Sequence, residues 1–160
     1  MPYDLSKPLV IGISSRALFN LEQENKIFEE QGVEAYEAYQ VAHENEILQK
    51  GAAFQLIKAF LKLNNTGLGR LVEVIIMSRN NANTCLRIFN SIQYYGLDIT
   101  RATLTSGAEI APYLKAFKTD LFLSANSVDV QSAINDGIAA GLILTGAAHA
   151  DARQKIDQIR

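Results

Sequence analysis

The sequence has little of what several function classes require. Its 160 residues contain a single cysteine, two histidines and no tryptophan. One cysteine, Cys85, cannot form an internal disulfide, and a lone thiol is compatible with a reducing cytosol. A zinc site needs several converging His, Cys or acidic ligands, and only His43 and His149 are present. We therefore expect a cytoplasmic protein without a disulfide framework and without a metal site in this chain.

Long apolar runs and an excess of positive charge are also missing. No apolar stretch approaches the roughly 18–20 residues that cross a bilayer. The first residues, Met1 to Leu5, lack the basic and apolar pattern of a secretory signal. Lysine and arginine number 15 against 17 aspartates and glutamates, and no basic stripe is visible. The sequence predicts neither a membrane protein nor a nucleic-acid binder.

Short apolar runs alternate with segments of helical spacing. The runs are Leu9–Ile13, Val72–Met77, Ala102–Thr105, Leu121–Leu123 and Ala139–Leu144. Their continuous apolar character is typical of strands that are buried on both faces of a parallel sheet. The helical segments between them are 53–63, 83–95 and 128–135, and the second of these stops at Gly96. The pattern predicts one α/β domain over residues 1–160, with a three-layer parallel sheet.

The stretch from 21 to 50 is too long for a plain connection between a strand and a helix. We interpret it as one or two helices inserted as a cap over the strand ends. Glu22, Glu24, Glu29 and Glu30 would form a solvated acidic face on this cap.

Polar side chains follow each predicted strand at the point where it ends. Ser14, Ser15 and Arg16 follow the first strand, and Ser78, Arg79 and Asn80 follow the second. Carboxyl ends of parallel strands meet at one sheet edge, where ligands of α/β folds bind. Hydroxyls and amides beside helix N-termini hold anions, and arginine pairs with phosphate. These residues are candidates for a phosphate or nucleotide site, although Ser and Asn also occur there simply as helix caps.

Three segments in order carry a family resemblance. They are Ser14–Phe19 after the first strand, Gln31–Tyr36, and His43–Glu46. Together they closely resemble the N-terminal half of the class I cytosolic 5'-nucleotidases, and the resemblance runs from about Leu9 to Leu144. It implies a haloacid-dehalogenase (Rossmann-like) fold and hydrolysis of nucleoside monophosphates such as AMP or IMP with Mg²⁺. Nucleotide substrates or effectors are the implied ligands.

The resemblance also shows which catalytic positions this segment lacks. The family's nucleophilic Asp falls on Ser14 and its acid/base Asp on Arg16. The phosphate-gripping hydroxyl is retained as Ser78, whereas the positions of the metal-binding acids fall on Ser124 and Ala125. Glu109 is the one acid that we expect near these loops. A phosphoaspartate mechanism needs a carboxylate nucleophile and hard oxygen ligands, so we expect this segment to be inactive by that route.

In the family, the catalytic Asp-x-Asp motif opens a second, related half. The final residues, 155–160, alternate in polarity, and we expect them to lead into the strand before that motif. The chain would then be the N-terminal half of a longer enzyme, with the C-terminal catalytic half as its partner. Alone, it would form a homo-oligomer through the uncovered apolar surface. The alternatives are a surface helix over 148–159 that ends a stand-alone pseudophosphatase, which binds a nucleotide or protein, and a hydrolase with Ser14 as nucleophile.

His43, Glu44 and Asn45 lie in the predicted cap. The resemblance makes them candidates for nucleotide recognition by the cap. Taken alone, one histidine beside two acids is also typical of a hydrogen-bonding cluster at a helix end.

Overall fold

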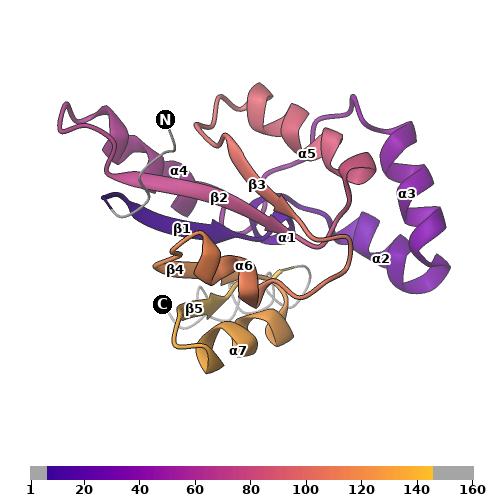
Figure 1. Cartoon of the computed structure of the whole chain (residues 1–160). Helices are drawn as coiled ribbons and strands as arrows, with labels where there is room; N and C mark the ends of the chain where they lie inside the picture. Colours follow the sequence, from indigo (N-terminus) through magenta and orange to yellow (C-terminus); the bar gives the residue numbers. More distant parts are fainter. Residues whose placement is uncertain (1–6, 146–160) are drawn as a thin grey trace, which may run out of the picture.

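A parallel sheet of five strands forms the centre of the molecule (Figure 1). The computed structural model describes residues 7–145. In sheet order the strands are β3 (Arg101–Leu104), β2 (Val72–Ser78), β1 (Leu9–Ile13), β4 (Leu121–Ser124) and β5 (Ala139–Leu142). Gly12 of β1 is in register with Ile75 on one side and Phe122 on the other. The predicted parallel α/β fold is confirmed, and each strand boundary lies within two residues of the predicted one.

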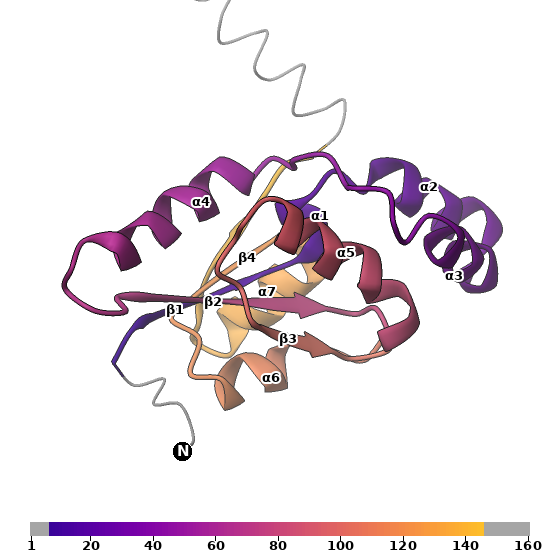
Figure 2. The same cartoon turned by 90° about the horizontal axis from the view of Figure 1, so that it is seen from above.

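Helices cover both faces of the sheet, which gives the three layers. Figures 1 and 2 show α4 (Phe54–Lys62) and α5 (Ala82–Tyr94) on one face, and α6 (Ala111–Ala116) and α7 (Ser127–Asn135) on the other. A short 3-10 helix, η1 (Leu63–Asn65), extends α4. The sequence analysis missed α6 and the four-residue α1 (Ser15–Leu18). One turn or two of helix is too short to establish a 3.6-residue pattern.

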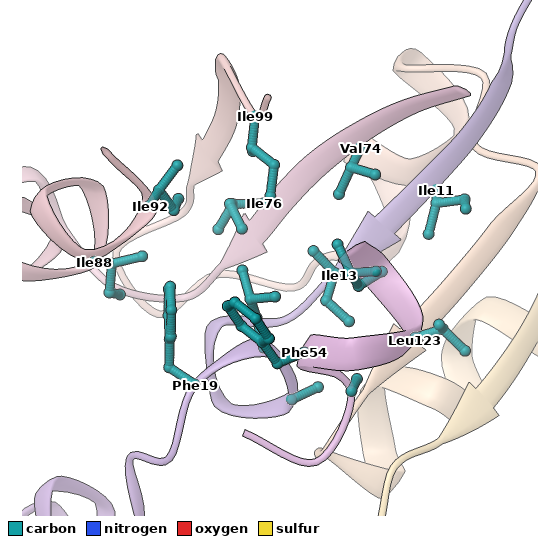
Figure 3. Packing of buried hydrophobic residues seen from close by; sticks show 14 of the residues in the cluster. Ile11, Ile13, Phe19, Phe54, Val74, Ile76, Ile88, Ile92, Ile99 and Leu123 are labelled. Atoms are coloured by element: carbon teal, nitrogen blue, oxygen red, sulfur yellow. The ribbon is translucent and has the colours of Figure 1, made fainter. Parts of the chain in front are cut away.

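Alternate residues of the strands divide the core between the two faces. Ile11 and Ile13 join the cluster under α4 and α5, whereas Val10 packs in the cluster under α6 and α7. Figure 3 shows Phe19 and Phe54 among the isoleucines of the larger cluster. Their ring centroids are 6.3 Å apart, and both side chains are almost fully buried. The tip of the first strand is therefore fixed by packing on both sides.

Two helices form the predicted cap. They are α2 (Glu22–Gln31) and α3 (Val33–Ala42), and Figure 2 shows them beyond the arrowhead ends of the central strands. Gly32 joins them with φ of +91°, a conformation that residues with a Cβ rarely adopt. Glu24 of α2 and Arg87 of α5 form a buried ion pair at 2.7 Å, and Gln40 of α3 accepts from the same guanidinium nitrogen at 3.2 Å. Because both ions are buried, this contact fixes the cap against the body.

Within residues 7–145, no helix has the length and apolar character needed to cross a membrane. The predictions for the tail, a strand entered from 155–160 or a helix over 148–159, lie outside the described residues.

Candidate functional site

A cavity of about 500 Å³ lies between the carboxyl ends of the strands and the cap helices. Its volume is in the range of small-molecule sites. All six residues of the predicted phosphate or nucleotide site line it: Ser14, Ser15, Arg16, Ser78, Arg79 and Asn80. From the cap come the side chains of Leu21, Glu24, Asn25, Phe28, Val33, Tyr36 and Glu37. The sheet edge and the cap therefore share one pocket.

Ser14 occupies the end of β1 and caps α1. Its Oγ accepts hydrogen bonds from the backbone N–H groups of Ala17 and Ala125, both at 3.2 Å. The first contact satisfies a free donor of the helix N-terminus, and the second ties β1 to the loop after β4. The described contacts of Ser14 include no basic side chain, so nothing among them would take a proton from its hydroxyl.

Arg16 is a cation with unused hydrogen-bonding capacity. Its Nη2 lies 3.5 Å from Oε1 of Glu22 and 3.4 Å from Oγ1 of Thr145. The Nε atom is buried and has no hydrogen-bond partner within the described part of the chain. An unsatisfied buried donor is costly, and an anion or acceptor that reached it would remove this cost.

Arg79 is already held by an acid. Its Nε donates to Oδ2 of Asp129 at 3.3 Å, and its Nη2 makes a second, short contact with Oδ1. Nη1 donates to the carbonyl of Gly107 at 3.3 Å. The hydrogen bonds that Arg79 donates to Asp129 raise the pKa of Arg79, with smaller contributions from the negative charges of Asp129 and Glu109. The guanidinium is thus neutralised on the side that faces α7.

The acids beside the cavity differ from the prediction. We expected Glu109 as the one acid near these loops, but Asp129, Glu37 and Glu24 line the cavity. Asp129 lies in the first turn of α7, after the cap residue Asn126. An acid at that position is normally explained by the helix dipole, so its contact with Arg79 could not be inferred from its place in the sequence.

Ser78, Asn80 and Tyr36 connect the end of β2 to the cap. The backbone N–H of Asn80 donates to Oγ of Ser78 at 3.1 Å, and the Tyr36 hydroxyl donates to Oδ1 of Asn80 at 2.9 Å. Burial raises the pKa of Tyr36, which keeps its hydroxyl protonated as a donor. Burial also raises the pKa of the Cys85 thiol to about 11, so that group is not a nucleophile at neutral pH.

His43, Glu44 and Asn45 are not among the residues that line the cavity. His43 follows α3, where its Nδ1 lies 2.7 Å from the carbonyl oxygen of Tyr39 and its ring stacks on Tyr39 at 4.0 Å. The carbonyl of Glu44 accepts from the side chain of Asn90. These contacts fit the helix-end interpretation, and recognition of a nucleotide by the three residues stays a prediction.

The donors at the strand ends do not fit Mg²⁺. This ion needs oxygen ligands in octahedral arrangement, usually with carboxylates among them. Asp129 is paired with Arg79, Glu24 is paired with Arg87, and Arg16 adds a positive charge. Across residues 7–145, no three His, Cys, Asp or Glu side chains converge as a metal site would require.

The parallel sheet in the order β3-β2-β1-β4-β5, the helical cap and the strand-end cavity define a Rossmann-like protein of haloacid-dehalogenase type. The family model for 5'-nucleotidase matches residues 1–160. Human "Cytosolic 5'-nucleotidase 1B" is 40% identical over 146 residues, which cover 87% of this chain and 24% of that protein. No solved structure matches the chain. The chain therefore belongs to the 5'-nucleotidase family, as the resemblance predicted, and spans about a quarter of the length of this relative.

Proposed function

We propose that this chain is the N-terminal, non-catalytic half of a cytoplasmic enzyme that hydrolyses nucleoside monophosphates to nucleoside and phosphate with Mg²⁺. The observation that carries this proposal is the end of β1, where Ser14 and Arg16 line the cavity and which, by the resemblance, is where the family has its two catalytic carboxylates. The family membership supports the nucleotidase activity of the whole protein. The small share of the relative that the chain covers leaves room for a separate catalytic half.

The contacts of Ser14 and Arg16 argue against catalysis by this segment. A nucleophilic hydroxyl needs a base within hydrogen-bond reach, and Oγ of Ser14 instead accepts from two backbone N–H groups. The guanidinium of Arg16 would repel a dication at the site where the family places Mg²⁺. We therefore place the metal and the Asp-x-Asp motif in the C-terminal half. This segment would pack against that half and help to close its cleft.

A hydrolysis assay on the purified chain tests this proposal. We expect no release of phosphate from AMP or IMP, with or without Mg²⁺. The intact mass of the endogenous protein is the second readout, and a product that continues past residue 160 into an Asp-x-Asp segment is the expected result. Turnover by the chain alone that disappears in the Ser14→Ala variant would overturn the proposal and assign Ser14 as nucleophile.

The cavity favours a second candidate of another class. A pocket of about 500 Å³ with polar strand ends and an aromatic cap is suited to binding without turnover. A stand-alone pseudophosphatase would use it for a nucleotide or for a segment of a protein partner. An endogenous product that ends at residue 160 and is monomeric would favour this candidate, because a separated half would self-associate through its uncovered surface.

A further inference from the structure

The cap side of the cavity carries an aromatic wall that the sequence analysis did not assign. Phe28 of α2 is 46% exposed, and Val33 at the start of α3 is 55% exposed beside the same cavity. The rings of Phe28 and Tyr36 meet edge to face, with centroids 5.9 Å apart and planes at 83°. Exposed aromatic rings in a pocket are surfaces on which nucleobases stack.

This wall is held in place before any ligand arrives. The Tyr36 hydroxyl donates to Asn80 at 2.9 Å and accepts from the side-chain amide of Gln40 at 3.3 Å. Gln40 in turn accepts from Arg87, which belongs to the buried ion pair that fixes the cap. A ring packed on a fixed partner loses little freedom when a base stacks on it, so more of the contact energy becomes affinity.

Polar groups for the edge of a base lie on the same two helices. Oε1 of Glu37 accepts a hydrogen bond from the side-chain amide of Asn81, whereas Oε2 of Glu37 has no hydrogen bond to any residue in 7–145. Asn25 of α2 lines the cavity and offers a donor and an acceptor. An exocyclic amine or ring N–H of a base would therefore find an acceptor beside the aromatic wall.

The charges at the sheet edge favour a single phosphate. Arg79 is neutralised by Asp129, and Arg87 is neutralised by Glu24. Arg16 has only the longer 3.5 Å contact with Glu22, and its buried Nε has no partner, so among the described lining residues it is the cation that is least neutralised by an acid. A second or third phosphate would find no unpaired cation among the described lining residues, because Arg79 is held by Asp129.

We infer that the cavity binds one nucleoside monophosphate without turnover, with the base against Phe28 and the phosphate toward Arg16. Nucleoside di- and triphosphates bind more weakly. This inference rests on the proposed function, because the family supplies the nucleotide as the class of ligand. It adds a second nucleotide site to the enzyme, separate from the catalytic one, and names the residues that select its ligand.

Titration calorimetry on the chain with AMP, adenosine, ADP, ATP and inorganic phosphate tests the inference. The Phe28→Ala variant weakens AMP binding at least fivefold, a loss on the scale of one base stacked on an aromatic ring. The matched control is Phe89→Ala, because Phe89 is an exposed ring of α5 that does not line the cavity. Phe28→Tyr retains the affinity and Phe28→Leu loses it, which separates the loss of the ring from a loss of folding. Arg16→Gln weakens AMP binding and leaves adenosine binding unchanged.

Several results would overturn the inference: no binding of AMP, equal AMP affinity in Phe28→Ala and wild type, inorganic phosphate binding as tightly as AMP, or ATP binding more tightly than AMP. These outcomes leave the proposed function standing, because that proposal is tested by hydrolysis in the purified chain and by the mass of the endogenous protein, not by binding of AMP in this cavity. Conversely, hydrolysis of AMP by the chain would contradict the non-catalytic assignment, whatever the effect of the Phe28 variants on AMP binding.

Discussion

Asp129 of α7 holds Arg79, at the end of β2, through two guanidinium nitrogens. Both residues line the cavity, where the side chain of Asp129 is 8% exposed and that of Arg79 is 38% exposed. The contact joins the end of β2 to a helix that packs on β4 and β5, which β1 separates from β2 in the sheet. It thereby sets the charge of the cavity as well as the position of α7.

The first prediction concerns this pair. Asp129→Asn removes the negative charge that occupies Arg79, and the freed guanidinium becomes available to a second phosphate. We expect ADP to bind at least about tenfold more tightly, the scale of one additional charge-assisted hydrogen bond. Titration calorimetry measures the change. Asp136→Asn is the matched control, because it removes the same charge from the C-terminal end of the same helix. Unchanged ADP affinity in Asp129→Asn would show that Arg79 does not face the ligand.

The second prediction concerns the attachment of the cap. Arg87→Met leaves the carboxylate of Glu24 buried without its partner, because these side chains are 7% and 6% exposed. Loss of one member of such a pair lowers the free energy of unfolding by about 3–5 kcal/mol. Urea unfolding measures this loss, and limited proteolysis shows whether cleavage moves to residues 22–42.

Arg70→Met is the control for the Arg87 variant, since Arg70 pairs with the half-exposed Asp98, and its second partner, the buried Glu73, keeps its ion pair with Arg101. The double variant Glu24→Leu, Arg87→Met should recover much of the lost stability, because no uncompensated charge stays buried. If Arg87→Met were no more destabilising than Arg70→Met, the ion pair would not be what fixes the cap.

The fold could be predicted from the sequence because its strands are short and continuously apolar. Leu9–Ile13 has the same bounds in the structure as in the prediction. The six strand-end residues met in one cavity because parallel strands place their ends together. The cap wall was not predicted, because the spacing of Phe28 and Tyr36 on two helices is equally consistent with core packing. The Arg79–Asp129 pair links residues 50 positions apart, and no local pattern reports such a contact.

The third prediction separates the structural role of Ser14 from a catalytic one. Ser14→Ala removes the acceptor for the N–H groups of Ala17 and Ala125. We expect a loss of about 1–2 kcal/mol in the free energy of unfolding, as for other N-cap serines. We expect no hydrolysis of AMP by either the wild type or the variant. Thermal and urea unfolding, together with a phosphate-release assay, test both parts. Ser127→Ala, at an exposed serine in the first turn of α7, should leave stability nearly unchanged. Equal stabilities of the two variants would contradict the capping role.

The fourth prediction concerns Cys85, which lies on the buried face of α5. Burial raises the pKa of its thiol from 9.0 to about 11, and hydrogen bonds with Ser78 and Asn80 oppose this shift. At pH 8 a thiol reagent should therefore react with the folded protein far more slowly than with the protein in urea.

The same shift links Cys85 to stability at alkaline pH. Between pH 9 and 11 the unfolded thiol loses its proton while the folded thiol keeps it, so the folded state binds more protons and stability falls as the pH rises. Below pH 9 this contribution is fully present.

Other groups also titrate in this range, so the informative quantity is the difference between the wild type and Cys85→Ala in urea unfolding at pH 8 and pH 11. We expect the wild type to lose more stability over this interval than the variant. Parallel losses in the two proteins would mean that the thiol ionises equally well in the folded state, and that the end of β2 is more open to water than its packing indicates.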